Sequence, residues 1–436
     1  MIKKIDFGKT KFDDLYQVFK YGSKEEFESK RSRLFPNGNN DNEVATTSIF
    51  LSSLCAVKEY REELLSNIGV KKINNKNVCL HAYTELENIS KEDRPDGLLV
   101  VTSGKGKPII EWACFVEVKI GTNPLDASQV DRYSDFARSI GINSIITISN
   151  DLVTSPENSP IKLKKRSFEL FHWSWAYLKV SALRLIRSNT IENEEHVFIL
   201  EELRKYIDGH KSLNNFINMG KDWKDAVTRI HSLDIKQKID AATLSSVVDS
   251  YIQEEKDVSL QLTARSGLHV ELIFKGDRKD EVAKMLQANK TITSEFMIDK
   301  DKNNSFFICT DFIRQEVKCF TNITITSGKA QAQTTKLLNL FEGSSGYTDD
   351  ILVDAFYLRN KCNNAESSLA SLFNEKEMSE PYSILDKELG NEVKHFEVKT
   401  KDLLGRDFKS TKNFIVKLED IAERFLNQVV IYQPKK

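Results

Sequence analysis

The sequence of 436 residues predicts an α/β fold with a mixed central sheet, followed by a helical segment and a C-terminal α+β domain. Two observations predict this class. Between residues 43 and 190, segments of helical and strand type follow in the order helix, three strands, helix, strand. Near residue 257 a second series of strand patterns begins. We therefore expect an N-terminal arm (1–42), an αβββαβ core (43–190), a helical connector (191–256) and the α+β domain (257–436).

Each element of the core follows from a local pattern. Apolar residues recur at helical spacing from Glu43 to about Asn67, and Gly69 ends that helix. Three strand-like runs come next, and a turn at residues 104–107 joins the last two. The predicted elements are a helix at 43–67, strands at 78–86, 97–102 and 109–119, a helix at 126–140, strands at 144–149 and 167–172, and a helix at 175–187.

Composition excludes several classes of protein. Lys and Arg number 63 against 64 Asp and Glu, so the net charge of −1 excludes a polycation, and any nucleic-acid contact must use local patches. The six cysteines are scattered without a C-x-x-C pair, and most lie in apolar runs, which predicts buried free thiols rather than disulfides or zinc ligands. The N-terminus lacks an apolar signal segment, and no run of eighteen uncharged apolar residues occurs. We expect a cytoplasmic protein without membrane contact.

Three charged residues around the third strand predict a chemical site. Asp96 lies in a Pro-Asp-Gly turn before the second strand, and Glu117 ends the apolar run Trp112–Val116. Lys119 projects from the same strand face as Glu117, because side chains alternate with period two. Charge at the end of a buried strand costs several kcal/mol per ion unless a partner or a metal offsets it. Magnesium suits two carboxylates, and the lysine suits a phosphate oxygen or an attacking water.

Pro95-Asp96, a spacer of about twenty residues, Glu117-x-Lys119 and then Gln129-xxx-Tyr133 resemble the PD-(D/E)xK nuclease superfamily. The resemblance covers roughly residues 40 to 190, and the predicted αβββαβ order agrees with that family's restriction-endonuclease-like fold. It implies hydrolysis of phosphodiester bonds in nucleic acid, DNA more than RNA. It also implies Mg²⁺ or Mn²⁺ held by Asp96, Glu117 and the Val118 carbonyl, with Lys119 orienting or polarising the nucleophile.

The same resemblance suggests three supporting residues. Members of the family often carry a further glutamate on the first helix, and Glu43 is the matching position, with Glu85 and Glu87 as weaker rivals. Gln129 and Tyr133 share one helical face, where such a pair helps to position substrate or Lys119. Each also has a purely structural interpretation. Glu43 and Gln129 could belong to N-terminal capping boxes, and Tyr133 could pack in the core.

Basic residues near the predicted site could neutralise phosphates and make binding dependent on salt. Trp173 and Trp175 could stack bases, but their place between a strand and a helix favours the core. The candidate nucleic-acid contacts are Lys105 and Lys107 in the glycine turn, and Lys162, Lys164, Lys165 and Arg166 in a basic cluster before the last core strand.

A second Glu-x-Lys occurs at Glu397 and Lys399, preceded by Asp386. Its strand is short, and no helix with a Gln-xxx-Tyr pair follows, so a solvated edge strand explains it better than a second active site. The other predicted elements of the C-terminal part are a hairpin at 258–274 around Ser266-Gly267, a helix at 278–288, strands at 293–298, 306–310 and 316–326, and helices at 329–341 and 415–430.

Two other functions compete with a metal-dependent nuclease. The first is a non-catalytic nucleic-acid-binding protein that keeps the fold, although the intact Asp96, Glu117 and Lys119 set favours catalysis. The second is a regulatory or scaffold protein whose function lies in residues 257–436. A nuclease core joined to an unfamiliar module resembles bacterial restriction and anti-phage effectors. We expect nucleic acid as partner, with a homodimer or higher oligomer as the candidate assembly.

Overall fold

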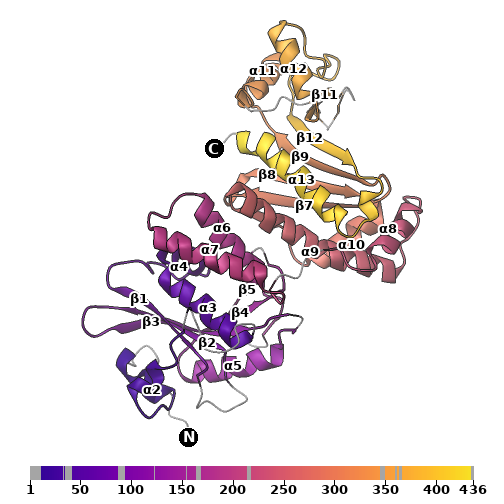
Figure 1. The fold of residues 1–436 in the computed structure, drawn as a ribbon. Coiled ribbons are helices and arrows are strands. Elements are labelled where there is room, and N and C mark those ends of the chain that lie inside the picture. Colours follow the sequence, from indigo (N-terminus) through magenta and orange to yellow (C-terminus); the bar gives the residue numbers. More distant parts are fainter. Residues whose placement is uncertain are drawn as a thin grey trace. The chain divides into compact units, whose positions relative to one another are not determined.

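The computed structural model describes residues 11–32, 34, 42–86, 94–121, 123–153, 155–163, 168–213, 218–343, 349–358, 361–362 and 366–433. The chain divides into two compact units, Met1–Asn215 and Phe216–Lys436, and each unit has its own sheet (Figure 1). This division falls inside residues 191–256. The helix α7 (Glu194–Gly209) packs on unit 1, whereas α8 (Trp223–His231) and α9 (Ala241–Ser266) pack together in unit 2.

Unit 1 is an α/β structure with a mixed sheet of five strands in the order β1-β2-β3-β4-β5. Strands β1 to β3 are antiparallel, while β4 runs parallel to both β3 and β5. The predicted order of helix, three strands, helix and strand is confirmed, except that Val57 breaks the first helix in two. The elements are α3 (Glu43–Ala56), α4 (Lys58–Ser66), β1 (Val78–Thr84), β2 (Gly97–Ser103), β3 (Ile109–Val118), α5 (Ala127–Ser139), β4 (Ser144–Ser149), β5 (Glu169–Ser174) and α6 (Trp175–Arg187).

Both faces of this sheet are covered. Helix α5 and the segment 11–32, with η2 (Phe12–Asp14), α1 (Leu15–Val18) and α2 (Lys24–Glu28), bury one face around Phe115. Helix α3 lies on the opposite side of the sheet from α5 (Figure 1). It packs so closely that a Cβ atom on Gly97 would lie 2.8 Å from Leu51 Cδ1. The glycine of the Pro-Asp-Gly turn therefore has a packing reason beside its turn chemistry.

Unit 2 is built on an antiparallel sheet of seven strands in the order β11-β10-β12-β9-β8-β7-β6. Helices α9, α10 and α13 share one apolar core with the sheet, as an α+β domain requires. Besides α8 and α9, the elements are β6 (Val270–Ile273), α10 (Arg278–Asn289), β7 (Thr291–Ile298), β8 (Asp301–Asp311), β9 (Glu316–Ile323), α11 (Ala330–Leu340), β10 (Leu352–Phe356), β11 (Ser367–Ser368), α12 (Leu369–Glu377), β12 (His395–Leu403), η4 (Asp407–Lys409), α13 (Asn413–Gln428) and η5 (Val430–Tyr432).

The predicted hairpin at 258–274 is wrong, because α9 continues to Ser266 and only β6 is a strand. Val258, Leu260 and Leu262 alternate with polar residues, yet Ser259 and Thr263 are buried as well. A helix that is buried on several sides loses the 3.6-residue pattern, so a period of two can arise within it by chance. Gly267, with φ of 76°, ends the helix in the left-handed conformation.

The six cysteines are free thiols, as predicted, but the expected burial holds only for Cys114 and Cys319. Cys79 is exposed, and Cys55, Cys309 and Cys362 are half-buried. No described helix combines the length and the apolar character that crossing a bilayer would require.

Candidate active site

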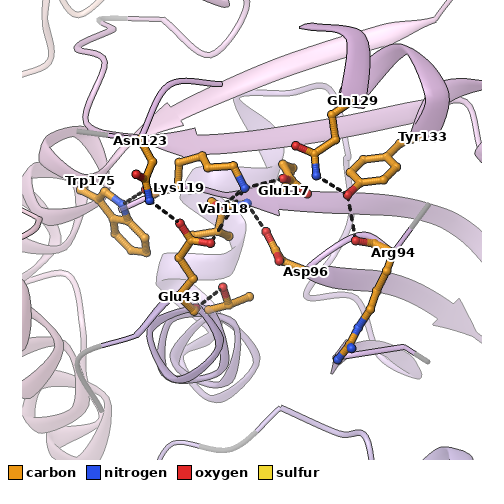
Figure 2. Close-up of polar contacts among 11 residues, drawn as sticks. Glu43, Arg94, Asp96, Glu117, Val118, Lys119, Asn123, Gln129, Tyr133 and Trp175 are labelled. Atoms are coloured by element: carbon orange, nitrogen blue, oxygen red, sulfur yellow. Dashed lines mark hydrogen bonds and ion pairs between the residues drawn. The ribbon is translucent and has the colours of Figure 1, made fainter. Parts of the chain in front are cut away.

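Asp96, Glu117 and Lys119 converge at one end of the β2–β3 pair (Figure 2). The register pairs Gly97 with Val116, which puts Asp96 opposite Glu117 across the two strands. Asp96 Oδ2 accepts a hydrogen bond of 2.7 Å from the Val118 N–H. Lys119 Nζ donates to Glu117 Oε1 at 2.7 Å and to the Val118 carbonyl at 3.2 Å. The side chains that the sequence selected therefore share a single site.

The two carboxyl groups of this site lie in surroundings that disfavour their ionised form. Glu117 is 1% exposed, and its buried Oε2 has no hydrogen-bond partner among the described residues. Burial, reinforced by the nearby Asp96, raises the pKa of Glu117 to about 8. Burial also raises the pKa of Asp96, against the opposing hydrogen bond from Val118. The two acids lie opposite each other on the paired strands, so each disfavours the ionised form of the other.

Lys119 supplies the positive charge at the site. Burial lowers the pKa of its ammonium, but Glu117, Asp96 and Glu43 outweigh burial and raise that pKa. The ammonium is therefore charged at neutral pH. Its carbonyl accepts a 3.1 Å hydrogen bond from Trp175 Nε1, and its N–H donates to the Ile148 carbonyl at 2.8 Å. Strand β4 and helix α6 thus fix the backbone from which the ammonium projects.

Glu43 reaches the same site from the first turn of α3. Its Oε2 lies 3.9 Å from Lys119 Nζ, and its Oε1 accepts a 3.2 Å hydrogen bond from Asn123 Nδ2. The N-terminal cap of the helix is Asn42, whose side chain accepts from the Ala45 N–H. The Glu43 side chain is turned to Lys119 and Asn123, and these two contacts are not those of a capping box.

Gln129 and Tyr133 connect α5 to the turn that carries Asp96. Gln129 Nε2 donates to the Tyr133 hydroxyl at 2.6 Å, and this hydroxyl donates to the Arg94 carbonyl at 2.9 Å. Asp126 caps the helix through the Ser128 N–H. The Tyr133 ring is buried in the core, so the structural interpretation of this residue also holds. Its hydroxyl fixes the backbone two residues before Asp96.

The predicted basic contacts are placed less favourably. Lys105 and Lys107 are exposed in the turn at the far end of the β2–β3 pair, and seven residues of strand separate them from Asp96. At about 3.3 Å per residue, that separation is roughly 20 Å. Lys162 is exposed in the loop before β5, while Lys164, Lys165 and Arg166 lie outside the described residues. Their role in binding nucleic acid stays a prediction.

Two contacts at the site, made by Asn123 and Trp175, were not predicted from the sequence. Asn123 is an exposed loop residue with no motif around it, and only the fold brings it to Glu43. Trp175 is buried, as its place between strand and helix indicated, but its Nε1–H bond to the Lys119 carbonyl follows from tertiary packing. The buried Trp173 and Trp175 are core residues and do not present rings to a base.

The donor set fits a divalent cation with oxygen ligands. Glu117 Oε2 supports this fit, because it is a buried carboxyl oxygen with a free lone pair beside a second buried carboxyl group. Lys119 already lies against Glu117 Oε1 and the Val118 carbonyl, two of the three predicted donors, so these oxygens attract a cation. Within the described ranges no group of three or more His, Cys, Asp or Glu side chains is arranged as a metal cage. Magnesium needs only one or two carboxylates with waters and substrate oxygens.

The second Glu-x-Lys sequence has a different environment from the one predicted. Strand β12 lies between β10 and β9, so the interpretation as an edge strand is wrong. Lys399 is 8% exposed and pairs with Asp354 and, at 2.8 Å, with Glu366. The preceding Asp386 contributes none of these contacts. A lysine that has two carboxylate partners within an antiparallel sheet is a structural ion pair.

Comparison of the chain with protein-family models, with curated proteins and with solved structures found no match. The functional assignment therefore depends on the geometry and chemistry of the chain's own residues.

Proposed function

We propose that the protein is a metal-dependent nuclease of the PD-(D/E)xK type, with unit 1 as its restriction-endonuclease-like catalytic domain. The observation that carries the proposal is Glu117, a buried carboxylate with one unpartnered oxygen opposite Asp96 and next to Lys119. A buried acceptor without a hydrogen bond costs about 1–3 kcal/mol, and a cation bound between Glu117 and Asp96 would offset that cost. The order of helix, three strands, helix and strand, with helices on both faces of the sheet, supports the same assignment.

In this proposal the carboxylates of Asp96 and Glu117 and the Val118 carbonyl hold Mg²⁺ or Mn²⁺. The bound ion supplies a more acidic water and stabilises charge on the leaving oxygen. Lys119 orients the attacking water or a phosphate oxygen, since its ammonium is charged and is held at its backbone by Trp175 and Ile148. Glu43 holds Lys119 from the opposite side. The substrate is nucleic acid, DNA in preference to RNA.

A cleavage assay tests the proposal. Purified protein is incubated with plasmid, single-stranded DNA and RNA in the presence of Mg²⁺, Mn²⁺ or EDTA. We expect cleavage that requires the metal, and we expect Asp96→Ala or Glu117→Gln to lower its rate by roughly 10²–10³-fold or more. Binding of the substrate should persist in both variants.

Glu111→Gln is the matched control, because Glu111 is an exposed glutamate on the same strand as Glu117. It should cleave like the unaltered protein. Substrate binding without cleavage under every metal condition would favour the non-catalytic alternative. Equal activity of the Glu117→Gln variant and the unaltered protein would overturn the site.

A further inference from the structure

Helix α7 lies outside the αβββαβ order, yet it is tied to both segments that carry the charged residues of the site. It packs on α6 and on α3. The hydroxyl groups of Tyr206 on α7 and Thr46 on α3 lie 2.8 Å apart. Thr46 is fully buried and lies one turn from Glu43. The Tyr206–Thr46 contact therefore links α7 to the first turn of α3, from which Glu43 reaches Lys119.

The turn after α7 is tied to the other segment, the loop that follows Lys119. The Gly121 N–H donates to the Ser212 carbonyl at 2.8 Å. Asn150, just after β4, donates through Nδ2 to the Gly121 carbonyl and to the Ser212 carbonyl, both at 2.8 Å. One amide group thus joins three segments that are distant in sequence. It closes the loop of residues 119–123 at its midpoint.

The loop held in this way connects the two halves of the site. Its first residue, Lys119, contacts Glu117, and its last residue, Asn123, contacts Glu43. Bonds from Ile148 and Trp175 fix the beginning of the loop. Besides the bonds at Gly121, the Asn123 N–H donates to the Ile120 carbonyl at 3.4 Å, and the bonds of Gly121 to Ser212 and Asn150 tie this backbone to other segments of unit 1. Loss of the bonds at Gly121 would loosen the backbone between Lys119 and the Asn123 amide that contacts Glu43.

We infer that Asn150 and Tyr206 are positioning residues that hold the Lys119 loop and the first turn of α3 in the arrangement that the proposed reaction needs. The inference rests on the proposed function for its consequence in catalysis, and on the hydrogen bonds alone for its structural part. A misplacement of about 1 Å at a catalytic group can lower a rate by roughly 10²-fold. Neither residue touches the reacting atoms, so both act through Lys119 and Glu43.

The test uses Asn150→Asp in the full-length protein, because a carboxylate has nearly the shape of the amide but cannot donate to the Gly121 and Ser212 carbonyls. Asn158→Asp makes the same chemical change at an exposed position of the same unit. Hydrogen exchange of the peptide 117–124 should become faster in Asn150→Asp and stay unchanged in Asn158→Asp. The value of kcat should fall by roughly 10–100-fold while KM for nucleic acid changes less than about 3-fold.

Tyr206→Phe and Thr46→Val form a double-mutant cycle for the other contact. Each variant removes one hydroxyl group, and the double variant should be no slower than the slower single variant, since the two hydroxyl groups act as one pair. Tyr16→Phe is the control, because it also removes one hydroxyl group, and the Tyr16 hydroxyl accepts its hydrogen bond from the neighbouring Gln17 side chain. Additive losses in the cycle would contradict the role of this pair.

The outcomes separate the inference from the proposed function. Unchanged exchange in peptide 117–124 of Asn150→Asp would overturn the inference, whatever the protein cleaves. Faster exchange with an unchanged kcat would also overturn it, because the loop would then be held without consequence for the reaction. Absence of cleavage in the unaltered protein would overturn the proposed function, and the exchange measurement would still decide whether Asn150 holds the loop.

Discussion

Each of the two units carries the same arrangement on paired antiparallel strands, an aspartate opposite a glutamate and a lysine two residues after the glutamate. The two sets are Asp96, Glu117 and Lys119 in unit 1, and Asp354, Glu397 and Lys399 in unit 2. The Glu-x-Lys spacing and the antiparallel pairing of aspartate with glutamate are thus the same in the two places. Their electrostatic surroundings are not.

The difference lies in the balance of charge. In unit 2, Lys399 pairs with Asp354 and Glu366, Lys401 pairs with Glu366, and Lys318 pairs with Glu397. Lysines and carboxylates alternate there in equal number. Among the described residues of unit 1, Lys119 is the cation beside three acids, Glu117, Asp96 and Glu43. This surplus of acids raises the pKa of Glu117, so a further cation could replace its proton, whereas the network of unit 2 is neutral without one.

A motif of two acids and a lysine is a candidate metal site only where its carboxylate oxygens outnumber the cations that contact them. Glu117 Oε2 is such an oxygen. In unit 2 each of the three acids has a lysine partner.

The largest expected effect comes from exchanging the lysines for methionine. Lys119→Met should lower cleavage by roughly 10²-fold or more, because the ammonium beside the site is lost. Lys399→Met should cleave at the normal rate, but its free energy of unfolding should fall by about 3–5 kcal/mol, because the buried Asp354 carboxylate loses its lysine while Glu366 keeps Lys401. Cleavage assays and urea unfolding measure the two effects. A loss of cleavage in Lys399→Met with an intact fold would remove the distinction between the two sets.

A smaller effect is expected at Glu254 in α9, a second buried acid with unpartnered oxygens but without a lysine beside it. Burial, and then Asp257 and Glu419, raise the pKa of Glu254, and burial raises the pKa of Glu419 to about 7. A native pKa above the unfolded value means that the folded unit holds more protons, so stability falls as pH rises through this range. Glu254→Gln should remove part of that fall and stabilise unit 2 at pH 8 by on the order of 1–3 kcal/mol.

Hydrogen exchange of α9 and α13 at pH 5 and pH 8 measures the Glu254 effect. The gain in protection should be present at pH 8 and small at pH 5, and cleavage should not change. Equal gains at both pH values would contradict a protonated Glu254 as the cause.

The smallest expected effect is at Tyr133. Tyr133→Phe keeps the buried ring and removes the hydroxyl group, with its hydrogen bonds to the Arg94 carbonyl and to Gln129 Nε2. Since one such bond is worth about 1 kcal/mol, cleavage should slow by roughly 3–10-fold. The set in unit 2 differs here, because Lys399 is held by the Asp354 and Glu366 carboxylates. An unchanged rate would show that the turn before Asp96 needs no such bond.

Local pattern was sufficient to predict the order of elements in unit 1 and the three residues that converge there. Apolar runs and turn residues encode β2 and β3, and the period of two places Lys119 beside Glu117. The pattern failed in α9, which is buried on several sides, and at β12, because the order of strands in a sheet is not read from their order in the chain. Asn123, Asn150 and Tyr206 were not predicted, since isolated amides and hydroxyl groups carry no spacing signal and gain their partners only through tertiary packing.

Binding of Mn²⁺ in the absence of nucleic acid, measured by titration calorimetry, tests the central claim most directly. The unaltered protein and Glu397→Gln should bind the ion equally, and Glu117→Gln should weaken binding by roughly 100-fold. Equal binding by the unaltered protein and Glu117→Gln, or a loss of binding in Glu397→Gln, would contradict the account that surplus carboxylate charge in unit 1 holds the metal.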